Sequence, residues 1–280
     1  MLAIPAAAAA DIYILDFNSS KSVYNANHLR HLLSAALEAS RPRYGDYELQ
    51  IAELRMERER LLIEMTRGEL VNLSAQTTTE QWERTLIPIR IPVDKGISSY
   101  RISLIDGQQQ AMFSAVKTLA ELKKIPLGAA RQWGSTAVFK QAGFEVMQSN
   151  SAVGLHSMLA AHRFQHFPRA LDEAVFEQEK YARQFSRLSI EKSFTIYFPH
   201  PRYFFVGGDQ RRLAERLEFG LQRLIDNGRY DQLFHEFYDE LIRKTNLDKR
   251  RVFRIANPLL PPHTPMKNAA YWYDPFTHKH

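Results

Sequence analysis

The sequence predicts an α/β protein built from two lobes. Short runs of β-forming residues alternate with amphipathic segments over residues 11–84, and the same alternation restarts after residue 110. Two extended segments that contain prolines, at 86–105 and 199–209, interrupt this rhythm. Alternation of strand and helix is typical of a parallel sheet with crossover helices. Two such units joined by two extended crossings indicate two lobes with a hinge between them.

The first unit alternates strands with helices. Residues 24–39 place a row of apolar side chains on one helical face: Leu29, Leu32, Leu33, Ala36 and Leu37. Gly68 is expected to end the second helix, and Thr79 is expected to cap the start of the third. The predicted strands are 11–17, 47–54 and 70–76, and the predicted helices are 24–39, 56–69 and 77–84.

The second unit repeats this pattern between the two extended segments. Its predicted helices are 111–124, 135–143, 152–162 and 171–185, and its predicted strands are 126–130, 144–149, 164–169 and 188–198. After the second extended segment come two amphipathic helices, 210–228 and 229–243, and a proline-rich tail from Asn257. Prolines and the cluster Tyr271-Trp272-Tyr273 indicate a strap packed on lobe 1, and the same aromatic residues would also suit a docking patch.

The composition is that of a folded globular protein, with 45% hydrophobic and 24% charged residues. The formal charge of +6 does not indicate a nucleic-acid partner, because the basic residues alternate with acidic ones, as in "AELRMERERLLIEMTRGE". The absence of cysteine excludes disulfides, zinc–thiolate sites and cysteine nucleophiles. We therefore expect no nucleic acid, no metal and no cofactor.

The first ten residues, "MLAIPAAAAA", are apolar and end in small side chains immediately before a strand-like run. This pattern is typical of the end of a secretory signal peptide cleaved before Asp11, although the charged first part of such a peptide is missing. The alternative is an alanine-rich leader without function. No other apolar run approaches the ~18–20 residues of a membrane span.

Several stretches together resemble the type 2 periplasmic solute-binding proteins, in particular those that serve polar amino acid importers. The most specific is "LAERLEFGLQRLIDNGRYDQLFHEFY" (213–238), which is similar to that family's closing helix pair. Three further stretches are similar: "TTTEQWERTLIPIRIP" (77–92), "SAVKTLAELKKIPLGAARQWGS" (114–135) and "AAHRFQHFPR" (160–169). The resemblance covers about residues 11–245.

The resemblance implies a periplasmic monomer whose lobes close on a small polar ligand, with an ABC permease or a membrane sensor as partner. It also implies the domain boundaries: a residual signal peptide at 1–10, lobe 1 at 11–100 and 208–280, and lobe 2 at 107–200. In such receptors an arginine of lobe 1 binds the ligand carboxylate through two parallel hydrogen bonds. Arg84 is at roughly that position and Arg90 is its rival.

In lobe 2, the resemblance places ligand contacts at the turn "RQWGSTAVF", where Trp133, Gly134 and Ser135 precede or begin a helix. The first N–H groups of a helix have no backbone partners and suit an anion. Alternatively, Trp133 is a hydrophobic wedge and Ser135 is only a helix cap. Phe17, at the end of the first strand, completes the candidates in lobe 1.

The stretch "HRFQHFPRALDEA" (162–174) departs from the amino acid receptors. The aspartate that holds a ligand's ammonium group there would fall near Arg169 or Ala170, and neither side chain is acidic. An ammonium group without an anionic partner is costly in a partly desolvated site. We therefore expect an anionic ligand held by Arg169 with Arg84 or Arg90, and Glu173 is a further candidate contact.

Two other classes of function stay open. A signalling protein would dock on a membrane receptor without binding a ligand tightly, and Arg169 would then form a structural ion pair with Asp172 or Glu173. A lyase on the same fold would need a general acid or base, which His156, His162 or His166 would supply. No catalytic motif accompanies these histidines, so we expect a protein that is not an enzyme.

Overall fold

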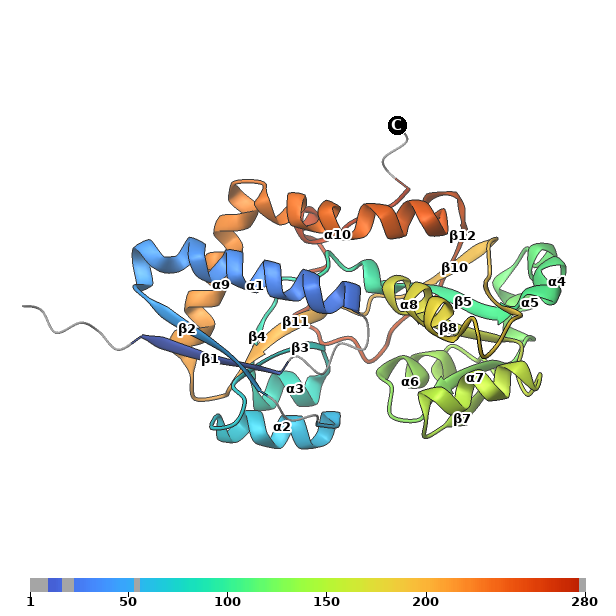
Figure 1. Ribbon diagram of the computed structural model, residues 1–280, viewed down its shortest axis with the longest axis horizontal. Coiled ribbons are helices and arrows are strands. Elements are labelled where there is room, and N and C mark those ends of the chain that lie inside the picture. The colour runs from blue at the N-terminus through green and yellow to red at the C-terminus, as the bar shows by residue number, and fades with distance from the viewer. Residues whose placement is uncertain (1–9, 17–22, 53–55, 277–280) are drawn as a thin grey trace, which may run out of the picture.

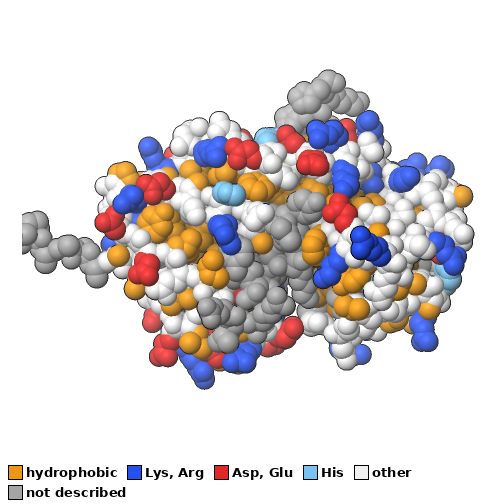
Figure 2. Space-filling model, in the orientation of Figure 1, with side chains coloured by type: hydrophobic (Ala, Val, Ile, Leu, Met, Phe, Trp, Pro, Cys, Tyr) orange, Lys and Arg blue, Asp and Glu red, His pale blue; other side chains and the backbone are white. Residues whose placement is uncertain are grey.

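The computed structural model describes residues 10–16, 23–52 and 56–276. Figure 1 shows two lobes side by side, each with its own sheet, and helix α10 (Arg229–Thr245) over the junction between them. On the face drawn in Figure 2, Lys and Arg side chains are interspersed with Asp and Glu. None of the described helices is long and apolar enough to cross a membrane.

Lobe 1 is a five-stranded sheet in the order β2-β1-β3-β11-β4, in which β1 runs parallel to β2 and β3, and β11 runs antiparallel to both of its neighbours. Its strands are β1 (Asp11–Asp16), β2 (Tyr47–Ala52), β3 (Leu73–Thr77), β4 (Ile87–Ile89) and β11 (Arg202–Val206). Its helices are α1 (Val23–Tyr44), α2 (Arg58–Arg67), α3 (Glu80–Thr85) and α9 (Arg211–Asp226).

Helices cover both faces of the lobe 1 sheet. The apolar row of α1 and the apolar face of α9 pack on one face, against Tyr13 and Leu15 of β1. Trp82 of α3 and Met65 of α2 pack on the other face. As predicted, Gly68 ends α2 in the left-handed conformation, with φ 72°, and the Thr79 side chain accepts a hydrogen bond from the Trp82 amide at the start of α3.

Lobe 2 is a seven-stranded sheet in the order β12-β10-β5-β8-β6-β7, with β9 paired to β5. Its strands are β5 (Tyr100–Asp106), β6 (Leu127–Ala130), β7 (Val146–Ser149), β8 (His166–Ala170), β9 (Leu188–Ile190), β10 (Phe194–Tyr197) and β12 (Arg251–Arg254). Helices α7 (Ala152–Ala160) and α8 (Leu171–Tyr181) cover one face. Helices α4 (Gln110–Ala115), α5 (Leu119–Lys123) and α6 (Gly134–Gln141) cover the other.

The helix predicted at 111–124 is two helices, α4 and α5. The chain leaves the helical conformation at Val116, and Thr118 starts α5 through a capping box with Glu121. The first helix therefore stops at Val116 and the next starts at Thr118, which the apolar periodicity of the segment does not reveal.

The chain crosses between the sheets at residues 90–99 and 198–201, within the two proline-containing segments. Four short 3₁₀ turns complete the described elements: Ile97–Ser99, Gly107–Gln109, Leu247–Lys249 and Ala269–Tyr271.

The end of the chain does not stay in lobe 1, to which the sequence analysis assigned residues 208–280. Strand β12 pairs in parallel with β10 and so extends the lobe 2 sheet. Buried Arg250 fixes this placement, because its guanidinium donates hydrogen bonds to the carbonyls of Thr245 and Phe194, each at 2.9 Å. The chain therefore crosses between lobes a third time, through α10.

Candidate functional site

The strand registers bring two arginines to the facing edges of the two sheets. Arg202 begins β11 and lies opposite Thr77, at the carboxyl end of β3. Arg101 is the second residue of β5 and lies opposite Ala170, at the carboxyl end of β8. The crossing at 198–201 connects these two edges. Carboxyl ends of strands from both lobes therefore meet around Arg101 and Arg202, where ligands bind in many α/β proteins.

Arg101 is a buried cation without a close anionic partner. The residue is 7% exposed, and the Glu173 Oε2 atom lies 3.7 Å from its Nη1, which is longer than a hydrogen bond. Its Nε has no hydrogen-bond acceptor among the residues that the structure describes. Burial lowers the pKa of Arg101 to about 10, so the guanidinium stays charged at neutral pH. An acceptor supplied from outside the chain would remove this desolvation cost.

His200 lies in the second crossing, close to three guanidinium groups. Its backbone N–H donates to the Ser99 hydroxyl at 3.0 Å, which fixes one crossing to the other. Burial, followed by the charges of Arg101, Arg58 and Arg202, lowers the pKa of His200 well below its ordinary value. The imidazole is therefore neutral at pH 7, and the positive charge of this cluster comes from the three arginines.

Two backbone features of lobe 1 hold the remaining arginines. Arg58, at the start of α2, donates to the Thr77 carbonyl at 2.7 Å and stacks 4.6 Å from the centre of the Trp82 ring. Burial lowers its pKa to about 10. Arg202 donates to the Ala75 carbonyl at 3.5 Å. We call Arg58, Arg101, His200 and Arg202 the interlobe basic cluster.

The start of α6 lies beside this cluster. A Cβ atom built on Gly134 would lie 3.4 Å from His200 Cε1, so the helix begins in contact with the imidazole. Ser135, the next residue, is buried. The turn that the sequence analysis assigned to ligand binding is therefore adjacent to the interlobe basic cluster.

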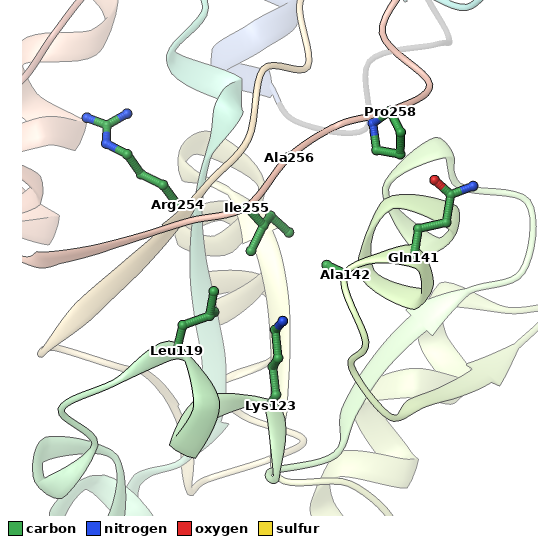
Figure 3. A pocket seen from close by; sticks show the side chains of 8 residues that line it. All are labelled: Leu119, Lys123, Gln141, Ala142, Arg254, Ile255, Ala256 and Pro258. Carbon is green, nitrogen blue, oxygen red and sulfur yellow. The ribbon is translucent and has the colours of Figure 1, made fainter.

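A hollow lies away from the junction. It is a groove of about 340 Å³ between α5, the end of α6 and the segment after β12 (Figure 3). The Lys123 side chain points into it, whereas the Arg254 guanidinium points away and stacks 4.7 Å from the Tyr197 ring. Most of its lining is exposed or half-buried, in contrast to Arg101. The described residues contain no group of three side chains suited to a metal ion.

No family model matches the chain, and no curated protein matches its sequence. Among solved structures, an ancestral arginine-binding protein bound to arginine is similar with a TM-score of 0.55 at 13% identity, over 82% of this chain and 97% of that chain. The ancestral amino acid-binding protein AncCDT-1, a precursor of cyclohexadienyl dehydratase, is similar with a TM-score of 0.54 at 9% identity, over 82% and 95%. A histidine kinase sensor domain with similarity to periplasmic binding proteins has a TM-score of 0.53 at 13% identity, over 81% and 95%.

The chain has the fold of the type 2 periplasmic binding proteins. Two lobes, two extended crossings and near-complete coverage of these structures establish this fold, as the resemblance implied. Identities of 9–13% establish the fold alone, since one fold hosts many ligands and activities.

In this periplasmic-binding fold, Arg169 is occupied by carboxylates of its own lobe. It is 3% exposed, and its Nε and Nη2 donate to Glu177 Oε1 at 2.9 and 2.6 Å. Its Nη1 lies 3.2 Å from Glu173 Oε2, which is one of the structural ion pairs that the sequence analysis kept open. The guanidinium also stacks 4.1 Å from the centre of the Trp133 ring. Arg169, Trp133 and Glu173 are thus brought together, as parts of a network around the buried Arg169.

The two lobe 1 arginines expected to bind a carboxylate are also paired. The Arg84 side chain is 73% exposed and lies 3.4 Å from Glu80 on the same helix. Arg90 donates to Glu83 Oε2 through Nε at 3.0 Å and Nη2 at 2.7 Å. Phe17 and residues 1–9, which include most of the expected signal peptide, lie outside the described residues.

Glu177 is expected to stabilise lobe 2 by neutralising Arg169. Burial by itself would raise the pKa of Glu177, but the charge of Arg169 and the nearby His156 hold it below the ordinary value. Glu177→Gln should lower the free energy of unfolding by about 2 kcal/mol, because it removes a hydrogen-bonded charge and leaves Arg169 buried. Urea unfolding at pH 7.5 measures this loss. The control Glu179→Gln, on the same helix but half-exposed, should change stability by less than about 0.5 kcal/mol. Equal losses in the two variants would contradict the role of Glu177.

The sequence analysis missed all four members of the interlobe basic cluster. A signal for two of them was present, since each extended crossing leads directly into a strand with an arginine at its first or second position, in "SSYRIS" and "PHPRYFF". Arg58 carried no such signal, because it lies in a helix full of alternating charges. Its approach to Trp82 depends on how α2 and α3 pack together.

Proposed function

We propose that this protein is a periplasmic solute-binding protein whose lobes bind a small anionic ligand, one that bears a carboxylate or a phosphate. The observation that carries the proposal is Arg101, a buried guanidinium with an unpartnered N–H in the junction between the lobes. A carboxylate or phosphate is the complementary acceptor for its planar fork of donors. Cations with a pKa of about 10 on both lobes extend the same complementarity.

In this proposal the ligand drives closure through contacts from both lobes. Arg58 and Arg202 belong to lobe 1, and Arg101 belongs to lobe 2, so an anion between them lowers their mutual repulsion only when the lobes are close. Gly134 and Ser135 complete the site with the amide groups that begin α6. Arg84, Arg90 and Arg169 take no part, because each already has a carboxylate partner.

An anion fits this site better than an α-amino acid does. The resemblance places the amine-binding aspartate of the related receptors near Arg169 or Ala170, and both of these residues are buried and neither is acidic. Glu173, the nearest carboxylate to Arg101, also contacts Arg169. A ligand ammonium group would therefore compete with two guanidinium groups for this carboxylate.

We propose the periplasm as the location and a signal peptide ending at residue 10 as the route. We propose that the protein is a monomer and that its partner is an ABC permease.

Sensing is the second candidate function, and the similarity to a histidine kinase sensor domain supports it. We infer that the function is ligand binding and not lyase chemistry. The similarity to a precursor of a dehydratase shows that a fold of this kind also gave rise to an enzyme.

Arg101→Met should weaken anion binding by at least about tenfold, the loss expected when one charge-assisted hydrogen bond is removed. Isothermal titration calorimetry with succinate, acetate, L-glutamate and inorganic phosphate measures the affinities. Because methionine is apolar and the buried arginine lacks a close partner, the melting temperature of Arg101→Met should not fall.

The matched control is Arg84→Met, which removes one positive charge by the same substitution. Arg84 is exposed and lies outside the interlobe basic cluster. It should leave all affinities unchanged. Binding of every anion with the same affinity in Arg101→Met and in the unsubstituted protein would overturn the proposed site. Tight binding of a zwitterionic amino acid that ignores Arg101→Met would overturn the proposed ligand class.

A further inference from the structure

Helix α10 belongs to the hydrophobic cores of both lobes. Tyr230 and Leu233, in its first part, are buried in the lobe 1 core. Phe234, Tyr238 and Leu241, further along, are buried in the lobe 2 core. The helix packs against α1 and α9 of lobe 1 and against α8 of lobe 2. A relative movement of the lobes must therefore bend α10 or pull one half of it out of a core.

The chain after β12 returns over the hinge. We call residues 256–276 the C-terminal strap. Its first part is fixed to the second crossing, because the Asn257 amide donates to the Pro199 carbonyl at 2.8 Å. Further along, the Trp272 indole N–H donates to the Pro265 carbonyl at 2.9 Å, which folds the strap onto itself.

The strap then covers the first crossing. The Tyr273 amide donates to the Lys95 carbonyl at 2.8 Å, and the Lys95 ammonium group donates to the Ala270 carbonyl at 3.2 Å. Lys95 is buried and also pairs with Asp231 of α10. The crossing, the strap and α10 are therefore connected through one lysine side chain.

Gly96 shows how closely the strap approaches. Lys95 and Gly96 both have left-handed backbone conformations, with φ 48° and 68°. A Cβ atom on Gly96 would lie 2.4 Å from the Trp272 ring, so only glycine leaves room for the indole. The Trp272 ring thus rests directly on the backbone of the crossing.

The last aromatic residues of the strap attach to both lobes. Tyr271 packs on the lobe 1 core, and Tyr273 and Phe276 pack on the lobe 2 core. The Tyr273 ring centre lies 4.8 Å from that of Phe234. Aromatic contacts of this kind add to the stabilisation that the buried area alone provides.

We propose that the C-terminal strap is a brace that limits the movement of the two lobes about their hinge. It anchors to both crossings and to both cores through contacts of the chain itself. The lobes of this protein therefore keep a narrow range of separations until the strap is released. A hinge rotation of one lobe relative to the other, of the kind that two flexible crossings allow, would break the contacts of Trp272 and Tyr273.

Distance measurements between spin labels test the brace in the absence of ligand. The chain has no cysteine, so Arg60→Cys on α2 and Ser157→Cys on α7 give one labelling site on each lobe, both exposed. With the strap intact, double electron–electron resonance should give one narrow distance distribution. Adding Trp272→Ala should broaden the distribution and add longer distances. Adding Met266→Ala, a matched control that truncates an exposed side chain of the same strap, should leave it unchanged.

Tyr273→Ala is the second variant, to be used if circular dichroism shows that Trp272→Ala does not fold. It removes the contact with Phe234 and should broaden the distribution in the same way. A distribution as narrow in the folded aromatic variants as in the intact protein would overturn the brace. Because no ligand is present, this result is independent of whether Arg101 binds an anion.

Discussion

Gly220→Leu should destabilise the protein by at least about 3 kcal/mol, the upper end of the usual cost of overpacking a core. Gly220 lies on α9 where this helix crosses α1, and a Cβ atom on it would lie 2.0 Å from the Ala36 carbonyl oxygen. The obstacle is helix backbone, which cannot turn aside as a flexible side chain can. Leucine would favour the helix over glycine by up to about 1 kcal/mol, so steric exclusion outweighs helix propensity.

Urea unfolding followed by circular dichroism measures the loss at Gly220. The control Glu215→Leu introduces the same side chain on the exposed side of the same helix, and its midpoint should stay close to that of the unsubstituted protein. If both variants unfold at the same urea concentration, the close contact between α9 and α1 does not determine stability.

Stability should fall by at least about 4 kcal/mol between pH 7.5 and pH 5, because buried His28 and His166 contribute about 2 kcal/mol each and buried His200 adds a loss of the same sign. Burial lowers the pKa of His28 and of His166 to about 4. His28 Nε2 lies 2.6 Å from the Val93 carbonyl, and His166 lies between the Ser103 hydroxyl and the Ile125 carbonyl, at 3.0 and 3.3 Å.

The free energy of unfolding falls with falling pH because the unfolded chain binds protons at these histidines at a higher pH than the folded protein does. In the unfolded chain a histidine has a pKa near 6.5, so below that pH protons bind the unfolded state in preference to the folded one. The stability due to the neutral histidines is fully present above pH 6.5 and is lost as the pH falls toward 4. Urea midpoints at pH 7.5, 6.5 and 5 follow the loss.

Two substitutions assign the pH dependence to these side chains. His28→Gln and His166→Gln should each reduce the difference between pH 7.5 and pH 5 by about 2 kcal/mol, because glutamine does not titrate. His263→Gln, at an exposed position of the strap, should leave the difference intact. A free energy of unfolding that is equal at pH 7.5 and pH 5 would contradict the prediction.

Much of the fold could be read from the sequence because local signals agree with it. The apolar face of α1, the glycine that ends α2 and the threonine that caps α3 are each short-range features, and each is found where the sequence places it. The periodicity failed between α4 and α5, where one threonine and its capping box divide an otherwise continuous apolar pattern.

The candidate site was far less accessible to sequence reasoning. The turn at Gly134 and Ser135 could be expected because a helix start follows a strand there. Whether an arginine is free to meet a ligand depends on partners brought by the fold. Arg169 finds Glu177 because the strand β8 and the helix α8 lie side by side, and Arg101 finds no carboxylate at hydrogen-bond distance.

The sequence by itself determined the two α/β units, the end of α2 at Gly68, the start of α3 at Thr79, and the crossings between the units, because periodicity and capping act over a few residues. Only the tertiary structure decided which charges are paired, that α10 serves two cores, and that Trp272 rests on Gly96. These contacts join residues far apart in the chain, as Gly96 and Trp272 are, 176 positions from one another. No local pattern in the chain records such distances, since they follow from the packing of complete lobes.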